Sequence, residues 1–128
     1  MRDVLFRGKP INKAFGDKFI YGSLGVIRED LVAIYDCLEF TEDIRHFVIP
    51  ETVGQYTGLT DKNGTKIFEN DVIMYGLIPC VVKWEKENSR FMLYEKGVYL
   101  RNGFNADTMK LKEVIGNIHD NPELLKVR

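Results

Sequence analysis

The stretch that most constrains the fold of this chain is residues 48–73. It contains two β-prone runs joined by the tetrapeptide Asp-Lys-Asn-Gly at 61–64. An Asn-Gly pair between two such runs is among the strongest short-range hairpin signals. In the first run, residues 53–59, Val, Gln, Thr and Leu alternate with Gly, Tyr and Gly. The sequence therefore predicts a β-hairpin with a tight turn, in which Asn63-Gly64 needs positive φ.

Short strands separated by polar turns are predicted over most of the remaining chain. The signals are runs rich in β-branched and aromatic residues, bounded by Gly, Pro, Asn or Asp. Strands are expected at residues 2–8, 18–27, 31–40, 53–59, 66–68, 71–75, 80–85, 90–94, 98–100 and 111–119. Polar connections are expected at residues 41–45, 76–79, 86–89 and 101–110. Asn121 is expected to cap a short C-terminal helical turn that begins at Pro122.

Two of these runs carry a further expectation. The run at 31–40 has apolar residues three and four apart, a spacing that also suits a short helix. We favour a strand there, because the neighbouring runs are strands and the preceding polar turn suits a hairpin. In the run at 18–27, Gly22 and Gly25 indicate a bulge or a bend.

The length and the strand pattern together limit the fold. A chain of 128 residues fits one domain, or two small halves that share a core. Its hydrophobic content of 45% and charged content of 29% are ordinary for a globular protein, so disorder along the whole chain is not expected. Many short strands with tight turns and little helix favour a small barrel or a sandwich. The predicted fold class is mainly β, with short antiparallel strands.

Composition also bears on where the protein works and what it binds. A net charge of −1 argues against a general polyanion binder, since phosphate affinity comes from massed Lys and Arg. No run approaches the roughly 18 apolar residues that cross a bilayer, and no export signal is evident after Met1. We therefore expect a cytoplasmic protein that does not engage a membrane. Cys37 and Cys80 are expected to be reduced thiols in the core.

Charge is spread unevenly along the chain. Residues 28–51 contain seven acidic and two basic residues, whereas residues 1–20 contain five basic and two acidic ones. An acidic block of this size usually forms a solvated face. The alternative is a docking surface for a basic partner, including the basic N-terminus of a second copy in a homo-oligomer.

No pattern for a metal site or a catalytic site emerges from the sequence. The potential ligands are scattered, without ligand spacing, at Cys37, Cys80, His46 and His119. The turn at 61–64 resembles a calcium loop only faintly, because the glycine and the bidentate Glu are misplaced. Neither a nucleophile elbow nor a phosphate-binding loop is present. The prediction is a non-enzymatic protein with no catalytic, cofactor-binding or metal residues, no cofactor, and a binding site that the sequence does not locate.

One segment, residues 83–101, interleaves basic and aromatic side chains. They are Lys83, Trp84, Lys86, Arg90, Tyr94, Lys96, Tyr99 and Arg101. On a small barrel such a face could stack bases and hold phosphates, which would make this a single-stranded nucleic-acid-binding protein. Three glutamates interrupt the segment, and Trp84 also reads as a core residue. We favour the structural interpretation of the segment and keep nucleic-acid binding as the alternative function.

The central stretch, VIPETVGQYTGLTDKNGTKIFENDVI, closely resembles the signature of the YopX family of phage and prophage proteins. The family pattern is matched from Pro50 to Asp71, and residues 5–7 and 21–24 resemble its opening strand and Y-G-S-L element. Residues 113–125 resemble the family's ending. One departure is Asn70, where the family usually has Gly. Asn tolerates the left-handed conformation, so the turn is expected to survive.

The resemblance implies both an architecture and a setting. It implies a single domain over 1–128, with an N-terminal β segment at 1–50, the hairpin plus an SH3-like barrel at 51–120, and a short tail or helix at 121–128. The barrel would be entered at Asp71. It also implies a phage or prophage protein acting in the bacterial cytoplasm, and it brings no catalytic residues. We expect a small protein-binding or adaptor module whose partner is a host protein, a phage protein or a second copy.

Overall fold

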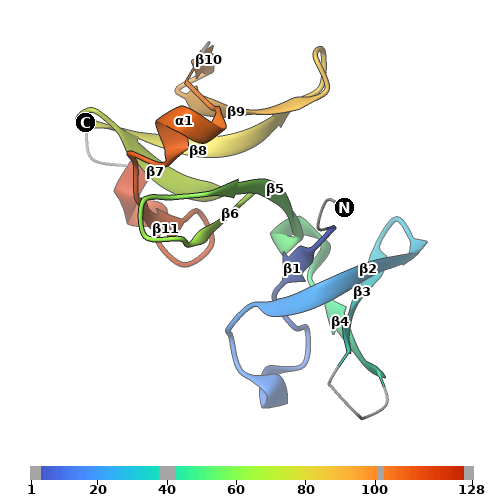
Figure 1. Ribbon diagram of the computed structural model, residues 1–128. Coiled ribbons are helices and arrows are strands. Elements are labelled where there is room, and N and C mark those ends of the chain that lie inside the picture. Colours follow the sequence, from blue (N-terminus) through green and yellow to red (C-terminus); the bar gives the residue numbers. More distant parts are fainter. Residues whose placement is uncertain (1–3, 38–42, 101–102, 126–128) are drawn as a thin grey trace. The chain divides into compact units, whose positions relative to one another are not determined.

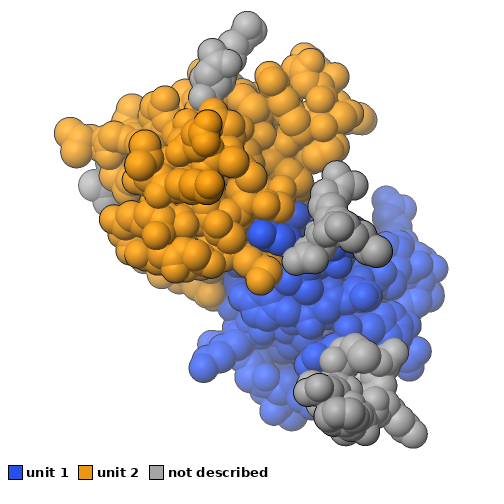
Figure 2. All heavy atoms as spheres, in the orientation of Figure 1, with its two compact units in different colours: residues 1–56 blue, residues 57–128 orange. Residues whose placement is uncertain are grey.

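The computed structural model describes residues 4–37, 43–100 and 103–125 (Figure 1). Within these residues the protein is mainly β, with eleven strands, one short α-helix and three 3-10 turns. The strands form two antiparallel sheets, one of six strands and one of five. By its contacts the chain divides into two compact units, residues 1–56 and 57–128, coloured separately in Figure 2. The predicted mainly β class is confirmed.

Unit 1 is built from four strands and the beginning of a fifth. Their bounds are β1 Phe6–Gly8, β2 Ile20–Arg28, β3 Leu31–Cys37, β4 Asp43–Val48 and β5 Gly54–Thr60. Consecutive strands from β1 to β4 pair antiparallel, and β1 also pairs with β5. The 3-10 turns η1 (Lys13–Phe15) and η2 (Pro50–Thr52) precede β2 and β5. The order of the six-stranded sheet is β4-β3-β2-β1-β5-β6.

The core of unit 1 is small and comes from alternate residues of its strands. Val32, Ile34 and Val48 are buried in it, and Phe6, Ile20, Leu24 and Val53 pack around them. Residues 9–11, which follow β1, run alongside β4 and its end. Ile11 N–H donates to the Phe47 carbonyl at 3.0 Å, and Ile49 N–H donates to the Lys9 carbonyl at 2.8 Å. This segment covers part of the edge of β4, which would otherwise be open to pairing.

The expectations for unit 1 are partly confirmed. The run at 31–40 is a strand over Leu31–Cys37, and its last three residues lie outside the described part of the chain. The first strand begins at Phe6 rather than at residue 2. The polar connection predicted at 41–45 is wrong for residues 43–45, which begin β4. Ile44 pairs with Asp36 and Arg45 with Tyr35, so pairing with β3 overrides the polar composition.

The glycines of β2 allow close packing and do not mark its irregularity. A bulge or a bend was predicted at Gly22 and Gly25, and the register between β2 and β3 shifts instead between Val26 and Arg28, after both glycines. A Cβ at Gly22 would lie 2.1 Å from the Tyr35 carbonyl oxygen, and one at Gly25 would lie 2.6 Å from the Tyr35 ring. Both positions therefore exclude a side chain because Tyr35 lies against them.

Unit 2 contains the remainder of β5, six further strands and two short helical turns. The bounds are β6 Lys66–Phe68, β7 Asp71–Tyr75, β8 Ile78–Glu85, β9 Arg90–Glu95, β10 Val98–Leu100, α1 Ala106–Met109, β11 Val114–Asn117 and η3 Pro122–Leu125. Five strands form a curled half-barrel in the order β10-β9-β8-β7-β11 (Figure 1). In chain order its first strand, β7, begins at Asp71.

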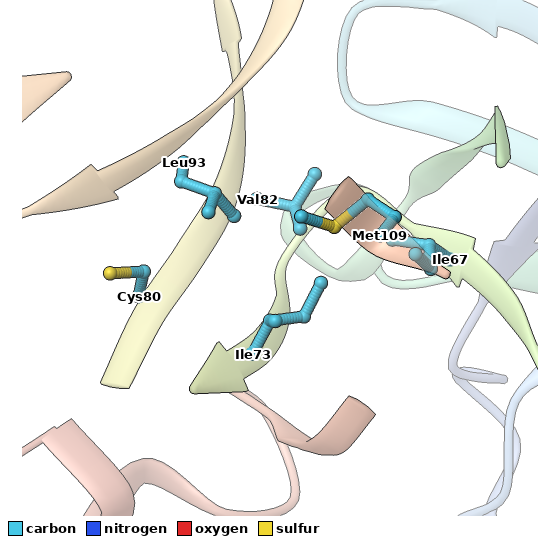
Figure 3. Close-up of a cluster of buried hydrophobic side chains, with 6 residues drawn as sticks. All are labelled: Ile67, Ile73, Cys80, Val82, Leu93 and Met109. Carbon is cyan, nitrogen blue, oxygen red and sulfur yellow. The ribbon is translucent and has the colours of Figure 1, made fainter. Parts of the chain in front are cut away.

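The core of unit 2 fills the inside of this half-barrel. Its fully buried side chains are Ile67, Ile73, Cys80, Val82, Leu93 and Met109 (Figure 3). They come from β6, β7, β8, β9 and α1, so the curled sheet, the hairpin and the short helix share one core. The Cys80 thiol is buried and outside any disulfide among the described residues, in agreement with the predicted reduced core thiol. The side chain of Cys37 lies outside the described residues.

The central hairpin is confirmed, but its turn differs from the predicted one. Gly64 N–H donates to the Asp61 carbonyl at 3.0 Å, closing a tight turn, and Gly64 has φ of 79°. Asn63 is not among the described residues with positive φ, so the prediction of positive φ at both positions is wrong for Asn63. A turn with left-handed backbone only at Gly64 suits the longer hairpin loops rather than a two-residue type I′ loop.

Asn70 adopts the left-handed conformation expected of it. Its φ is 75°, its N–H donates to the Val82 carbonyl at 2.8 Å, and its carbonyl accepts from Ile118 N–H at 3.1 Å. The next residue, Asp71, is buried and its carboxylate accepts from Phe68 N–H at 2.8 Å. The turn is thus held on both sides, which explains how it tolerates a residue other than glycine.

Several other predictions for unit 2 need correction. The turn predicted at 76–79 is only two residues long, because Ile78 and Pro79 pair with β7 and belong to β8. The loop predicted at 101–110 contains α1, whose first turn is capped by the Asn105 side chain accepting from Thr108 N–H. The last strand is shorter than 111–119. The C-terminal helical turn is present, but the Asn121 side chain accepts from Asn117 N–H, which precedes that turn.

Candidate functional site

A groove lies on the face of the five-stranded sheet that is turned away from the unit 2 core. Side chains alternate between the two faces of a strand, and on β8 Cys80 and Val82 point into the core. Pro79, Val81 and Lys83 therefore point to the other face, where they line a groove of about 240 Å³. These alternating positions make the floor of the groove part of a rigid, paired strand.

The neighbouring strand and the C-terminal turn complete the groove. Tyr94 of β9 pairs directly with Val81, so the two side chains share a face. Ile118 and Leu125 line the remaining wall, and η3 carries Leu125. The floor and this wall are thus largely apolar, with one tyrosine ring among them.

A hydrogen-bond network fixes the chain segment that bears this wall. The Asn117 side-chain oxygen accepts from the N–H groups of His119 and Asp120 at 3.0 and 2.9 Å. Its amide nitrogen donates to the Asp120 carboxylate at 3.1 Å, and its backbone carbonyl accepts from Asn121 N–H at 2.8 Å. Asn117 is itself buried. The turn between β11 and η3 is therefore well defined, and so is the wall of the groove.

Two lysines stand at the rim of the groove. The Lys83 ammonium lies 5.5 Å from the centroid of the Tyr94 ring, within the range of a cation–π interaction. Lys96 occupies the two-residue turn between β9 and β10, where both Lys96 and Gly97 have positive φ, as in a type I′ turn. Neither lysine takes part in an ion pair within the described part of the chain. Glu95 supplies a carboxylate to the same groove.

The basic and aromatic segment at 83–101 does not form a single face. Trp84 pairs with Phe91, and their rings meet edge to face at 5.0 Å on the core side of the sheet. Lys83 and Tyr94 lie on the opposite face. Trp84 is 44% exposed, so its interpretation as a buried core residue is wrong. It covers the end of the core through Phe91 instead.

The remaining basic and aromatic residues of this segment differ in their surroundings. Arg90 Nε donates to the Glu85 carboxylate at 2.8 Å, which neutralises it locally. Tyr99 contacts Tyr94 with ring centroids 5.1 Å apart and extends the aromatic surface beside the groove. Lys86 is exposed in the turn after β8, and Arg101 lies outside the described residues. Of the described basic and aromatic side chains in this segment, Lys83, Tyr94 and Lys96 line the groove.

Asp61 lies in the loop that faintly resembles a calcium site. Both oxygens of its carboxylate accept hydrogen bonds from the backbone. One oxygen accepts from Asn63 and Thr65 N–H at 2.8 and 2.9 Å, and the other accepts from Val114 N–H at 3.0 Å. Burial acts to raise the pKa of Asp61, but these hydrogen bonds outweigh burial and hold the pKa below its ordinary value. Asp61 ties the hairpin turn to β11.

The candidates for metal binding whose side chains are described belong to three different parts of the fold. Within residues 4–37, 43–100 and 103–125, no group of three His, Cys, Asp or Glu side chains could hold a metal ion. His46 lies in β4 with its ring edge to face against Phe15, whereas His119 lies in the turn after β11 of unit 2. Cys80 is in the unit 2 core.

The described members of the acidic block are mostly solvated. Glu29, Asp30 and Glu51 are exposed, and Asp30 forms an exposed ion pair with Arg28 at 2.7 Å. Other members, including Glu39 and Glu42, lie outside the described residues. An exposed pair of this kind adds little to stability.

Unit 1 carries another hollow, which is lined largely by apolar and aromatic residues. Ile11, Phe15 and Phe47 surround a hollow of about 230 Å³, and Phe15 is 58% exposed. The Arg45 guanidinium lies 4.8 Å from the centroid of the Phe47 ring.

Sequence reasoning missed both hollows. For the groove in unit 2, the available signal was the run of apolar residues from Pro79 to Val82, which places apolar side chains on both faces of one strand. For the hollow in unit 1, the aromatic residues Phe15 and Phe47 are too far apart in the sequence to suggest a common surface.

Both the sequence and the fold are similar to those of known proteins. A family model described as YopX protein matches residues 23–126. A crystal structure of protein EF1440 from Enterococcus faecalis has a similar fold, with a TM-score of 0.60 and 21% sequence identity. The similarity covers 98% of this chain and 99% of that one. A search of the curated proteins returned no match. Among the described residues, no helix is long and apolar enough to cross a membrane.

Proposed function

Because the chain belongs to the YopX family, we propose that it is a small phage- or prophage-encoded module that binds another protein in the bacterial cytoplasm and has no enzymatic activity. The partner is a host or phage protein, with a second copy of the chain as the other candidate. The family resemblance supports the phage origin, and the groove in unit 2 supports the binding role.

The observation that carries this proposal is the preformed groove on the outer face of β8 and β9. Pro79, Val81 and Leu125 offer apolar surface, and the lysines at the rim offer polar contacts. An apolar centre with a polar rim is typical of protein interfaces. Its volume of about 240 Å³ lies below the ~300–1,000 Å³ usual for small-molecule sites. The groove thus suits side chains of a partner better than a whole cofactor.

Single-stranded nucleic acid is the weaker alternative. Binding without sequence preference needs a basic track beside a series of stacking aromatic rings. Here Trp84 and Tyr94 lie on opposite faces of the sheet, and Arg90 is paired with Glu85. The groove face therefore offers two lysines and two tyrosines, together with Glu95.

Site-specific cross-linking tests the proposal. A benzophenone amino acid is placed at position 96, at the rim of the groove, and in a matched protein at position 110, which is exposed at the end of α1. Each protein is expressed in a bacterial host and irradiated, and the products are separated with and without nuclease treatment. We expect a discrete, nuclease-resistant protein adduct at position 96 that position 110 does not give.

Two results would contradict the proposal. One is an adduct at position 96 that nuclease removes, which would assign the groove to nucleic acid. The other is the same pattern of adducts, or none, from both positions. An adduct with the mass of two copies would retain the protein-binding function and identify the partner as a second copy.

A further inference from the structure

We infer that the groove binds an extended acidic peptide of another protein, in which two carboxylates four residues apart flank one apolar residue. This inference rests on the proposed protein-binding function and specifies the chemistry of the partner. It follows from the order of side chains along β8 and β9, which Figure 1 shows side by side in the half-barrel.

The two lysines at the rim of the groove indicate that the bound peptide is acidic. Lys83 and Lys96 both line the groove, and neither forms an ion pair within the described residues, whereas Glu95 is the opposing charge. Tyr94 holds the Lys83 ammonium over its ring without neutralising it. A partner that brings carboxylates to these lysines would be complementary in charge, and a basic one would be repelled.

The strand register determines the spacing between the two lysines along the groove. Lys83 pairs with Met92 of β9, and Lys96 lies four residues after Met92, directly beyond the end of β9 at Glu95. Four residues of strand span about 13 Å. Val81 and Tyr94, an aligned pair, lie between the two lysines. The groove therefore presents a cation, an apolar centre and a second cation in that order along the strand direction.

An extended peptide matches this arrangement with its own period of two. Its side chains at i, i+2 and i+4 point to the same face, and those at i and i+4 are also about 13 Å apart. Carboxylates at i and i+4 can then reach Lys83 and Lys96, while an apolar side chain at i+2 covers Val81 beside Leu125. The motif is acidic, any residue, apolar, any residue, acidic.

The chain itself does not contain this motif. Of its 19 acidic residues, Glu39 and Asp43 stand four apart, but Thr41 between them is polar. A second copy consequently lacks the peptide that the groove fits, and we assign the occupant to a different protein.

Selection from random peptides tests the inference while the partner is still unidentified. The full chain is immobilised, and a displayed library of random linear peptides is selected against it. We expect enriched peptides to carry Asp or Glu at i and i+4 and an apolar residue at i+2. A Lys83→Glu/Lys96→Glu variant should bind them at least about tenfold more weakly. Versions of the peptides with lysine in place of the acids should regain binding to that variant.

A matched pair of lysines serves as the control. Lys86→Glu/Lys110→Glu makes the same charge change at exposed positions outside the groove, and it should leave affinity within about twofold. Equal weakening by both variants would show a general charge effect and overturn the inference. Enriched peptides without the acidic pair, or no enrichment at all, would also overturn it. Cross-linking at position 96 would still decide the proposed function separately.

Discussion

At the scale of single residues, Asp61 connects the hairpin turn to β11. Its carboxylate accepts from the N–H groups of Asn63, Thr65 and Val114, and its side chain is buried. The sequence showed a turn aspartate, but it gave no sign of Val114, which is 53 residues away. A long-range hydrogen bond of this kind leaves no periodic pattern, and for that reason the role of Asp61 could not be predicted.

Replacing Asp61 should weaken the fold substantially. Asp61→Ala leaves three backbone N–H groups without their acceptor, so the free energy of unfolding should fall by about 2–4 kcal/mol. Urea denaturation followed by tryptophan fluorescence measures this change. Glu87→Gln, in the exposed turn after β8, is the control and should stay within about 0.5 kcal/mol of wild type. Similar stability of the two variants would refute the role of Asp61.

The same carboxylate should make stability depend on pH. The pKa of Asp61 is lower in the folded state than its ordinary value of 3.8. The carboxylate therefore stabilises the fold above pH about 4, and this stabilisation is lost as pH falls through the folded-state pKa. The difference in unfolding free energy between wild type and Asp61→Asn should be full at neutral pH and shrink in acid. A difference that stays constant down to pH about 2 would be inconsistent with the lowered pKa.

Gly64 should be required for its backbone conformation alone. Its φ is 79°, and nothing lies within 4 Å of a Cβ built there, so a larger residue meets strain but no clash. Gly64→Val should lower stability by about 1–3 kcal/mol, whereas Gly64→Asn should cost less, because Asn tolerates this conformation. Thermal unfolding of both proteins provides the comparison. Equal melting temperatures for wild type and Gly64→Val would contradict the left-handed turn at Gly64.

At the scale of elements, local patterns predicted the positions of most strands but missed the start of β4 and helix α1. β7 was predicted with its observed bounds, and β9 within one residue. The start of β4 was missed because Asp43 and Arg45 are polar, and their pairing with β3 is a tertiary effect. Helix α1 was missed because its one buried side chain, Met109, gives no helical periodicity.

Gly22 offers a test of the pairing between β2 and β3. A Cβ there would lie 2.1 Å from a backbone oxygen of β3, which has little freedom to move. Gly22→Ala should therefore destabilise the protein by about 1–3 kcal/mol and speed hydrogen exchange in β2 and β3. Ser23→Ala, at a neighbouring position of the same strand, is the control. If the amide hydrogens of β2 and β3 exchanged as slowly in Gly22→Ala as in the control, the close approach of the two strands would be refuted.

At the scale of the whole molecule, the sequence was sufficient for the fold class and the family but not for the site. The mainly β class and the YopX membership follow from local patterns and a long motif, which each stand in a continuous stretch. The groove is assembled from the consecutive strands β8 and β9 and from Ile118 and η3, which come later in the chain, after β10 and α1. Alternation along β8 already separates Lys83 from Trp84, but only the sheet register shows that Lys83 shares a face with Tyr94.

The central claim is that this groove binds protein, and a pair of leucine variants tests it most directly. Leu125 lines the groove, whereas Leu111 is 78% exposed outside it. The measurement is the yield of the nuclease-resistant adduct from the cross-linker at position 96, in Leu125→Glu and in Leu111→Glu. We predict that Leu125→Glu abolishes the adduct while the protein still unfolds cooperatively, and that Leu111→Glu retains it. Equal yields from the two folded variants would contradict the claim.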